Sequence, residues 1–512
     1  MNFLVRMKLI HLKSLLVGLF IVSCPAFIHA EKRPKKPNII FILVDDLGYA
    51  DVGFNGSKWF ETPAMDALAR QSLVLDNAYM YPTCSPSRTA FFTGKQSFRT
   101  GVYTVPVLET GTDQENIFSR WTVEKKHTLF SVPLAEAGYQ AIHLGKWHIV
   151  GPDPLHELQL EFPLKEKLTQ PQPGDFSWVA AHKSKAIQEY YPQGRGFVKN
   201  VGGTYRGDPA LEAGGYKSET MGYHAPFSNP FIEPKPTDSW LTDRLTDEAL
   251  EFMEQYKDSS FFVNLHYYAV HRPITSRSQT LMDKYMGKEG DAVTGQGLGP
   301  RRKEMAAYAT MVESVDQNLQ RILDFLDAEG LRQNSVIILT SDNGYNGGQS
   351  SNDLMRGSKG YIYEGGIRVP ALINWPGQVE PRRSQVPITV FDYYPTFLDL
   401  AGVDNYTGQL DGHSLTSLFK KDDRKLQKRN IYWHLASQYK HGTCSVIRSG
   451  PYKLIQFLAS GELELYDLAQ DPLESDNLVT KEPLLTKRLL ADLVHWRQSN
   501  AVPLPPNAAL KY

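Results

Sequence analysis

The sequence predicts an α/β protein with a large, mainly parallel or mixed sheet sandwiched by helices, followed by a smaller C-terminal α+β subdomain with an antiparallel sheet. Three observations support this prediction. Apolar, β-branched runs alternate with helical patterns before residue 411, each of these runs ends in polar residues, and shorter strand-like segments follow residue 411. The 512 residues also exceed what one hydrophobic core usually holds. We therefore expect two parts in the folded chain.

The N-terminal segment has the pattern of an export signal. Basic residues precede the apolar run 15–22, which is too short to span a membrane, and small residues follow it. Cleavage after Ala30 is favoured. Residues 21–24 also resemble a bacterial lipoprotein box at Cys24, although Pro25 and a further apolar stretch fit that alternative poorly. The mature protein is thus expected to be exported, either periplasmic or secreted, with lipidation at Cys24 as the alternative.

Composition and charge place the mature chain among soluble globular proteins. Hydrophobic residues make up 41% and charged residues 22% of the sequence. Removing residues 1–30 takes away three basic residues and no acidic one, so the formal net charge changes from −1 to −4. This charge predicts no nucleic-acid partner and no attraction to a membrane surface. Only Cys84 and Cys444 then remain, which excludes a framework of disulfides.

Four strands buried on both faces are predicted before residue 411. Each is a short, continuously apolar run, as expected where helices cover a parallel sheet on both sides. The four runs are 38–44, 140–144, 261–265 and 336–340.

Two helices are predicted between these strands. A capping threonine and a proline begin a helix over 62–69. A longer helix carries apolar residues at spacings of three and four from Tyr308 to Leu326 and ends at Gly330. The stretch 151–236 is rich in proline, glycine and aromatic residues and lacks periodicity, so we expect long loops there that could face a substrate.

Beyond residue 411 the pattern changes to short segments that predict antiparallel strands. They are 431–433, 444–447, 452–455 and 464–467. A helix carrying apolar residues from Leu485 to Trp496 closes this part of the chain. The predicted organisation is a signal peptide (1–30), a large domain (31–410) and a C-terminal subdomain (411–512).

Two ligand pairs, Asp45-Asp46 and Asp342-Asn343, lie just beyond the ends of predicted strands. Ligands of such sheets bind beyond the carboxyl ends of the strands. Three carboxylates and an amide offer only oxygen ligands, and Ca²⁺ tolerates the irregular geometry of loop ligands better than Mg²⁺ does. Either pair alone is also a common turn sequence. Both pairs together predict a calcium site.

Cys84 opens the run Cys-Ser-Pro-Ser-Arg, which a Thr-Gly pair follows. Pro86 suits the first turn of a helix, so Cys84 is expected just before the helix start, where free N–H groups favour an anion. Arg88 adds a planar cation suited to sulfate or phosphate oxygens. The alternatives are a disulfide between Cys84 and Cys444, or a buried thiol that only packs.

This run resembles the modification signature of the type I sulfatases, a formylglycine-dependent family with an alkaline-phosphatase-like fold. The resemblance extends from Asn38 to about Leu478 through five separated motifs in the family's order. It implies that a maturation enzyme converts Cys84 to formylglycine, whose hydrate is the nucleophile. It also implies one Ca²⁺ ion, held by Asp45, Asp46, residue 84, Asp342 and Asn343.

The resemblance further implies roles for basic residues. Arg88 would polarise the hydrate and neutralise sulfate charge, and His148 would hydrogen-bond the hydrate. Lys146 lies in the family's Gly-Lys-Trp-His block, and Lys359 in its Arg-Gly-Ser-Lys-Gly block. Both lysines would bind sulfate oxygens.

His271 would protonate the departing alcohol or contact the sulfate. His266 is its rival for this role, but the proline two residues after His271 matches the family's pattern. We expect His143, a strand residue, to be structural.

The implied function is hydrolysis of sulfate esters, with sulfated carbohydrates from polysaccharide degradation or aryl sulfates as substrates and 31–410 as the catalytic domain. One alternative is a phosphatase or phosphodiesterase of the same superfamily, against which the run at Cys84 and the lack of a second metal set argue. The other is a glycan-binding pseudoenzyme that is unmodified at Cys84.

Overall fold

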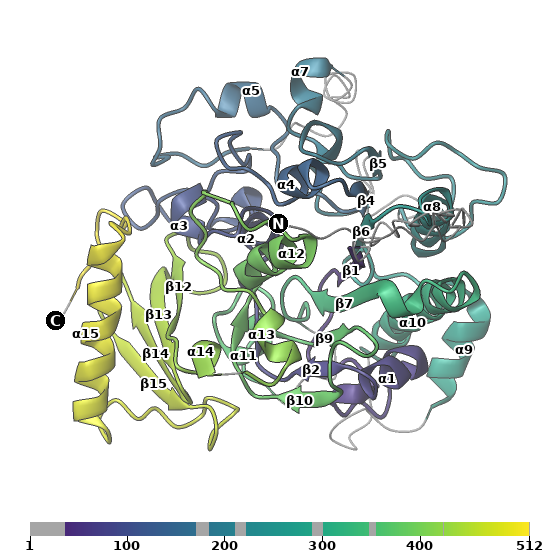
Figure 1. The fold of residues 1–512 in the computed structure, drawn as a ribbon. Coiled ribbons are helices and arrows are strands. Elements are labelled where there is room, and N and C mark those ends of the chain that lie inside the picture. The colour runs from purple at the N-terminus through teal and green to yellow at the C-terminus, as the bar shows by residue number, and fades with distance from the viewer. Residues whose placement is uncertain are drawn as a thin grey trace, which may run out of the picture. The chain divides into compact units, whose positions relative to one another are not determined.

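An eight-stranded sheet lies at the centre of the computed structural model (Figure 1). The structure describes residues 36–169, 184–209, 222–288, 301–347, 355–422 and 424–510. The strand order is β10 (Arg382–Ser384), β2 (Leu73–Leu75), β9 (Ala371–Asn374), β7 (Ser335–Ser341), β1 (Asn38–Val44), β6 (Phe261–Tyr267), β4 (Gln140–Gly145) and β5 (Lys199–Val201). From β7 to β5 all pairs are parallel, whereas β9 runs antiparallel to both neighbours. The predicted mixed, mainly parallel sheet is confirmed.

Strand β1 explains why helices cover both faces of this sheet. All its residues are buried, and successive side chains point to opposite faces. The odd-numbered residues from Ile39 to Leu43 enter one core and the even-numbered residues from Ile40 to Val44 enter the other. The even face is covered by α1 (Pro63–Ala69), α8 (Leu241–Gln255), α9 (Gln279–Gly287) and α10 (Arg302–Ala328). The odd face is covered by α2 (Cys84–Thr93), α4 (Ser131–Glu136) and α12 (Tyr393–Ala401).

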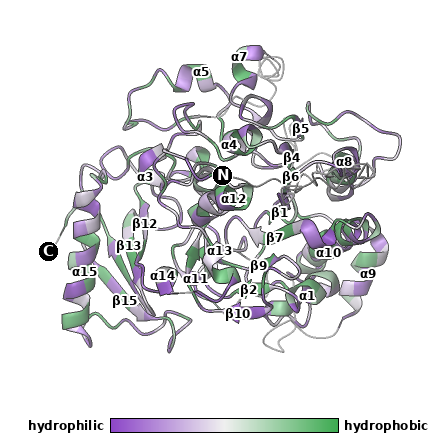
Figure 2. Cartoon of the chain, in the orientation of Figure 1, coloured by the Kyte–Doolittle hydropathy of each residue, from purple (hydrophilic) through white to green (hydrophobic). Residues whose placement is uncertain are grey.

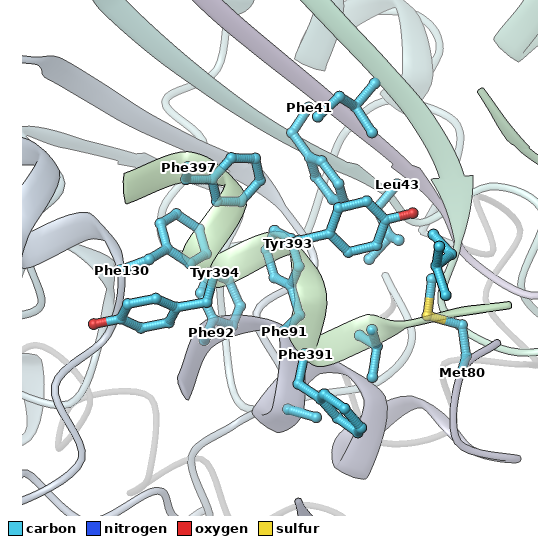
Figure 3. Close-up of a cluster of buried hydrophobic side chains, with 14 of the residues drawn as sticks. Phe41, Leu43, Met80, Phe91, Phe92, Phe130, Phe391, Tyr393, Tyr394 and Phe397 are labelled. Carbon is cyan, nitrogen blue, oxygen red and sulfur yellow. The ribbon is translucent and has the colours of Figure 1, made fainter. Parts of the chain in front are cut away.

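An aromatic cluster fixes α2 against the sheet (Figure 3). The Phe41 ring of β1 stacks on Phe91 of α2 with centroids 4.4 Å apart. Phe92 stacks on Phe130, the residue before α4, at 5.5 Å, and Phe130 contacts Phe397 of α12 at 4.9 Å. Every residue of α2 is buried. The helix is therefore held along its whole length, and its first residue has a fixed place beyond the end of β1.

The C-terminal part is an antiparallel sheet with one long helix. The strands are β12 (Ile431–Leu435), β13 (Cys444–Ser449), β14 (Tyr452–Phe457) and β15 (Leu463–Asp467), in that order. Helix α15 (Pro483–Ser499) packs on β13 and β14 and buries Leu489 and Leu493 completely. Figure 2 shows the matching alternation of hydrophilic and hydrophobic residues along α15. The four predicted strands and the closing helix are confirmed.

Shorter elements connect these parts. A three-stranded sheet has the order β11 (Ile388–Thr389), β3 (Ala78–Tyr79) and β8 (Arg368–Val369). The short α-helices are α3 (Ser97–Thr100), α5 (Pro154–Glu157), α7 (Lys185–Gln188), α11 (Glu364–Ile367), α13 (Thr416–Phe419) and α14 (Arg424–Gln427). The 3₁₀ turns are η1 (Gly53–Asn55), η2 (Pro106–Leu108), η3 (Pro192–Gly194), η6 (Arg332–Asn334) and η7 (Val390–Asp392).

Three local predictions need correction. Helix α2 begins at Cys84 itself, and Pro86 is its third residue, which still lies in the first turn. Thr62 precedes α1, but its hydroxyl makes no capping bond, because it contacts a side chain and a distant N–H group instead. The stretch 151–236 contains β5, a strand too short to show a periodicity. The disulfide between Cys84 and Cys444, the alternative interpretation, is absent, because both are free thiols.

The predicted signal peptide, residues 1–30, lies outside the described residues. Within the described ranges, no helix combines the length and the apolar character needed to cross a bilayer. The domain boundary after residue 410 stays a prediction.

Candidate active site

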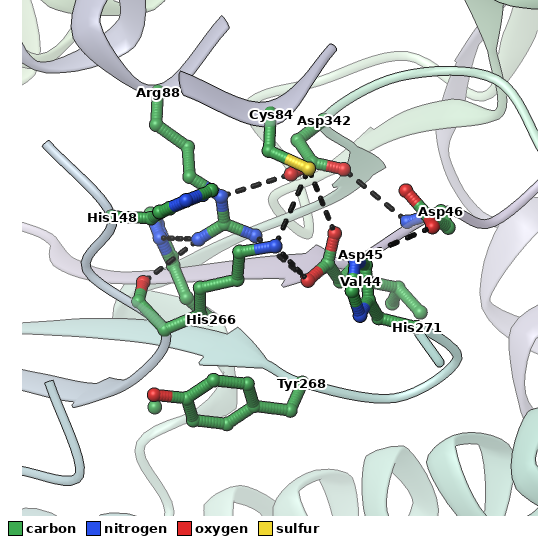
Figure 4. A network of polar contacts seen from close by, with 12 residues as sticks. Val44, Asp45, Asp46, Cys84, Arg88, His148, His266, Tyr268, His271 and Asp342 are labelled. Atoms are coloured by element: carbon green, nitrogen blue, oxygen red, sulfur yellow. Dashed lines mark hydrogen bonds and ion pairs between the residues drawn. The ribbon is translucent and has the colours of Figure 1, made fainter. Parts of the chain in front are cut away.

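The first turn of α2 places Cys84 among charged side chains (Figure 4). The residue is only 1% exposed. Its Sγ lies 3.6 Å from Oδ1 of Asp45, and Nζ of Lys146 donates to it at 3.3 Å. Burial raises the pKa of the Cys84 thiol to about 12, against the opposing charge of Lys146. An unmodified Cys84 in this setting is a neutral thiol at pH 7 and a weak nucleophile.

The two ligand pairs meet because their strands are neighbours. Strands β1 and β7 pair in parallel with Val44 opposite Ser341, so the next residues of both leave the sheet at the same edge. The Asp46 N–H donates to Oδ1 of Asp342 at 3.2 Å, and Nδ2 of Asn343 donates to Oδ1 of Asp46 at 2.7 Å. The predicted proximity of the two pairs is present in the structure.

Asp46 has a backbone φ of 61°, in the left-handed region that few residues other than glycine adopt. Its carboxylate accepts two hydrogen bonds from Nζ of Lys359, at 2.6 and 2.8 Å, and lies 3.9 Å from Nε2 of His271. Burial alone would raise the pKa of Asp46, but the charge of Lys359 and its hydrogen bonds outweigh burial and hold this pKa well below its usual range. Asp46 is therefore an ionised carboxylate.

Asp45 is in the opposite electrostatic state. Burial and the charge of Asp342 raise its pKa to about 8. Two cations oppose this rise without cancelling it: Nζ of Lys146 lies 2.6 Å and Nη2 of Arg88 3.8 Å from Oδ2 of Asp45. A bound cation would remove this repulsion between carboxylates. Oδ1 of Asn343 is also buried without a hydrogen-bond partner among the described residues. An oxygen-rich cluster with an unsatisfied amide oxygen fits a hard cation such as Ca²⁺.

The tightest group of possible ligands differs in part from the predicted set. One ligand atom from each of Asp45, Asp46, Cys84 and His271 lies within 4.8 Å of the others. His271 thus stands at the candidate metal site as well as near the expected position of the sulfate. Asp342 joins the same network through Asp46 and Arg88.

Arg88 is completely buried and held in one orientation. Its Nε pairs with Oδ2 of Asp342 at 2.9 Å, and its Nη1 donates to the Lys146 carbonyl at 2.8 Å and contacts Nδ1 of His266 at 3.1 Å. Its Nη2 has no hydrogen-bond partner in the described part of the chain. One N–H edge of the guanidinium is therefore available to an anion beside Cys84.

His148 and His271 lie at opposite ends of the cluster in Figure 4, beside Arg88 and Asp46 respectively. His148 has a φ of 58°, and its buried Nδ1 lacks a hydrogen-bond partner among the described residues. Nδ1 of His271 donates to the Arg272 carbonyl at 2.7 Å, so Nε2 faces Asp46. Burial and the charge of Lys146 lower the pKa of both histidines well below the usual value.

The other two histidines lie behind the site. His266 is fully buried between Arg88 and the rings of Phe91 and Phe92, so it supports the guanidinium. His143 is fully buried and contacts Asn264, in line with a structural role. His271 thus borders the acidic cluster and His266 lies behind Arg88, and the choice of His271 for proton transfer stays a prediction.

Sequence reasoning missed the contribution of Gly145. It has a φ of 85°, and a Cβ at this position would lie 2.0 Å from the His266 carbonyl oxygen. The same carbonyl accepts a hydrogen bond from the Lys146 N–H at 2.9 Å. Glycine at the end of a strand is the signal that could have indicated this close approach.

All predicted site residues lie in this one cluster. They come from the ends of β1, β4, β6 and β7, from α2 and from the segment before α11. They are Asp45, Asp46, Cys84, Arg88, Lys146, His148, His271, Asp342, Asn343 and Lys359. Their individual roles stay predictions.

Comparisons with known proteins agree with this arrangement. A family model described as Sulfatase matches residues 37–403, and one described as N-sulphoglucosamine sulphohydrolase, C-terminal, matches residues 357–498. The chain is 28% identical to a protein named Sulfatase from Formosa agariphila, over 92% of this chain and 90% of that protein. It is also 28% identical to N-acetylgalactosamine-6-sulfatase of Mus musculus, over 83% and 72% of the two chains. A solved structure described as Ps i-CgsB in complex with k-i-k-neocarrahexaose is similar, with a TM-score of 0.68, 26% identity, and coverage of 93% of this chain and 95% of that one.

Proposed function

Because the chain belongs to the sulfatase family and is a sulfuric ester hydrolase, we propose that it releases sulfate from sulfated carbohydrates with a formylglycine hydrate at position 84 and one Ca²⁺ ion. The observation that carries this proposal is the place of Cys84, in the first turn of α2 between Asp45 and Lys146. The relative named N-acetylgalactosamine-6-sulfatase and the similar structure in complex with k-i-k-neocarrahexaose support a carbohydrate substrate.

Asp45, Asp46, Asp342 and Asn343 would hold the ion, with residue 84 beside them. When bound, Ca²⁺ supplies positive charge opposite the sulfate oxygens, and an aldehyde hydrate in place of the thiol supplies the attacking oxygen. The second hydroxyl of that hydrate distinguishes it from a serine, which could not release the sulfate again.

The basic residues neutralise the sulfate charge. Nη2 of Arg88 and the ammonium groups of Lys146 and Lys359 surround Cys84 within a buried site, where a charge interaction is stronger than in water. Because they are fixed by Asp45, Asp46 and other buried partners, these groups need little rearrangement when charge builds up on the sulfate oxygens.

Two histidines can move protons. The Arg272 carbonyl accepts a hydrogen bond from Nδ1 of His271, which opposes the lowering of its pKa by burial and by Lys146, and the negative charge of a bound sulfate ester would favour the protonated ring further. Nε2 of that ring can then give its proton to the oxygen of the departing alcohol. His148, with its unpartnered Nδ1 among the described residues, is placed to hydrogen-bond the nucleophile.

The test compares protein produced with and without a formylglycine-installing enzyme, which we propose as its maturation partner. We expect matured protein to hydrolyse 4-nitrophenyl sulfate and sulfated sugars and to hydrolyse 4-nitrophenyl phosphate much more slowly. Mass analysis of the peptide containing Cys84 should show an aldehyde in place of the thiol. Cys84→Ala should be inactive, and Cys84→Ser should release at most one alcohol per molecule. Full activity of a preparation with an intact thiol, or a preference for the phosphate ester, would contradict the proposal.

We also propose that the protein acts after export, in the periplasm or outside the cell. The predicted signal at residues 1–30 supports this location. N-terminal analysis of the mature protein tests it: cleavage after Ala30 supports plain export, whereas a lipid on Cys24 supports the alternative processing. An N-terminus that retains residues 1–30 would contradict both.

A further inference from the structure

A loop of the C-terminal sheet lies directly against the segment that carries Lys359. Gly360 has a φ of +92°, and a Cβ on it would lie 2.7 Å from the Tyr439 ring and 3.0 Å from Cδ of Lys440. The Gly360 N–H donates to the Pro82 carbonyl at 2.6 Å, two residues before Cys84. Residues between β12 and β13 therefore stand beside the proposed sulfate site.

Lys440 is a half-buried cation between two aromatic rings. Its Nζ lies 5.7 Å from the ring centroid of Tyr361 and 5.7 Å from that of Tyr439. Within the described ranges, no carboxylate forms an ion pair with it. Burial and the charge of Lys359 lower its pKa. A partly desolvated cation next to a second cation is a place where an anionic ligand is favoured.

A pocket of about 710 Å³ adjoins this cation. The Tyr361 ring that contacts Lys440 also forms part of the pocket wall. Its other walls include Tyr345, Arg356, Ser358, Tyr363 and His441. Aromatic faces together with hydroxyl, guanidinium and imidazole groups can contact both the apolar face and the hydroxyls of a sugar ring.

Arg356 adds a further positive group to the pocket but is already engaged. Its guanidinium stacks on Tyr363 with a distance of 3.7 Å to the ring centroid and lies 3.9 Å from Oε2 of Glu464. Lys440 is thus the cation near this pocket that lacks a carboxylate partner among the described side chains.

We propose that the pocket beside Lys359, with Lys440 and Tyr361, is a subsite for a sugar residue that carries a second anionic group, either a sulfate ester or a carboxylate. The inference rests on the proposed function, because it places the sulfate to be released at Lys359 and Cys84. It assigns to the C-terminal sheet a part in choosing multiply charged saccharides over singly charged ones.

The test measures how sugars inhibit hydrolysis of 4-nitrophenyl sulfate by the matured protein. The probes are N-acetylgalactosamine 6-sulfate, its 4,6-disulfate, and the 6-sulfate linked to glucuronate. We expect the wild-type protein to bind at least one of the doubly charged probes more tightly than the singly charged one. Lys440→Met should reduce this preference on the order of tenfold, the usual effect of losing a charge-assisted hydrogen bond. The two doubly charged probes distinguish a sulfate ester from a carboxylate.

Lys487→Met is the matched control, because it makes the same substitution, with the same loss of charge, at an exposed position on α15. It should keep the wild-type preference. Equal inhibition by all three probes, or an unchanged preference in Lys440→Met, would overturn the subsite.

A binding measurement separates this proposal from the proposed function. If matured protein hydrolyses no sulfate ester, the sulfatase proposal fails, and calorimetry of the same probes with Cys84→Ala still tests the subsite. Tighter binding of a doubly charged probe to Cys84→Ala, with the difference lost in Cys84→Ala/Lys440→Met, supports it. Equal binding of the probes overturns it.

Discussion

Gly145 ends β4 in a backbone conformation that other residues adopt only with strain. An added side chain would also meet the His266 carbonyl oxygen, 2.0 Å from the position of its Cβ. We expect Gly145→Ala to lower the free energy of unfolding by about 2–5 kcal/mol, since it combines a left-handed φ with overpacking. Because Lys146 and Arg88 are bonded to the same turn, sulfate ester hydrolysis should fall by a larger factor than in other variants of equal stability.

Gly138→Ala is the matched control for this prediction. Gly138 also has a positive φ, of 91°, but nothing lies within 4 Å of a Cβ built on it. Its replacement should cost only about 1–2 kcal/mol and leave kcat unchanged. Urea unfolding and steady-state kinetics of both variants check the difference. Similar losses in the two variants would show that the contact with His266 is unimportant.

The candidate site was predictable at the level of single residues because its members follow buried strands. Asp45 and Asp342 come directly after strands β1 and β7, and parallel strands bring their ends to one edge of the sheet. Contacts that depend on three-dimensional packing were not predictable. Neither the support of Arg88 by His266 nor the approach of Lys440 to Gly360 leaves a pattern in the sequence.

Helix α2 depends on its neighbours rather than on an amphipathic pattern. It is buried on all sides, and Phe91 contacts Phe41 of β1, Phe397 of α12 and Phe130 just before α4. We expect Phe91→Leu to destabilise the protein by about 1–3 kcal/mol and to lower kcat clearly, because the helix that carries Cys84 loses part of its packing. Thermal unfolding together with kinetics on 4-nitrophenyl sulfate measures both effects.

Phe252→Leu gives the comparison on the opposite face of the sheet. Phe252 of α8 is 3% exposed, similar to Phe91 at 2%, and packs in the other core against Tyr256. We expect a comparable loss of stability with little change in kcat. If both variants lose activity in the same proportion, the placement of α2 is not what limits catalysis.

The elements that sequence patterns predicted well are those with long apolar runs. Strand β1 has the predicted bounds, and β7 extends its prediction by one residue at each end. Strands β2, β9 and β10 were missed because each has only three or four residues, and their partners lie far away in the sequence. The predicted start of α2 differs from the observed one because proline is compatible with several positions in the first turn of a helix.

A buried ionic network joins the C-terminal sheet to the segment that follows Lys359. Lys453 of β14 donates to Glu364, the first residue of α11, at 3.2 Å and to Glu474 at 2.8 Å. We expect Lys453→Met to destabilise the whole molecule by about 3–5 kcal/mol, since Glu474 then remains buried without its cation and Glu364 keeps only the more distant Arg368, 3.9 Å away. Lys453→Met/Glu474→Gln should recover part of this loss in denaturant unfolding. A single variant as stable as wild type would mean that the network holds the two sheets only weakly.

The pH dependence of folding follows from buried histidines. His434 is fully buried and contacts the Ser445 hydroxyl at 2.9 Å and the Pro503 carbonyl at 2.8 Å. Burial, with the charge of Arg497, lowers its pKa to about 3 from an ordinary value of 6.5. Between these two pKa values the unfolded chain binds a proton at His434 that the folded protein does not bind. The free energy of unfolding therefore has its full value from this residue above pH 6.5 and falls as the pH drops toward 3.

His434→Gln should remove the part of the pH dependence of the free energy of unfolding that His434 causes. We expect the free energy of unfolding of the wild type to fall more steeply between pH 6 and 4 than that of the variant, by up to about 1.4 kcal/mol per pH unit. His156→Gln is the control, because His156 is exposed and its loss should leave the slope unchanged. Urea unfolding at several pH values measures the slopes. Parallel profiles for the wild type and His434→Gln would mean that His434 binds its proton in the folded protein as readily as in the unfolded chain, and the acid sensitivity would then have to come from other buried groups.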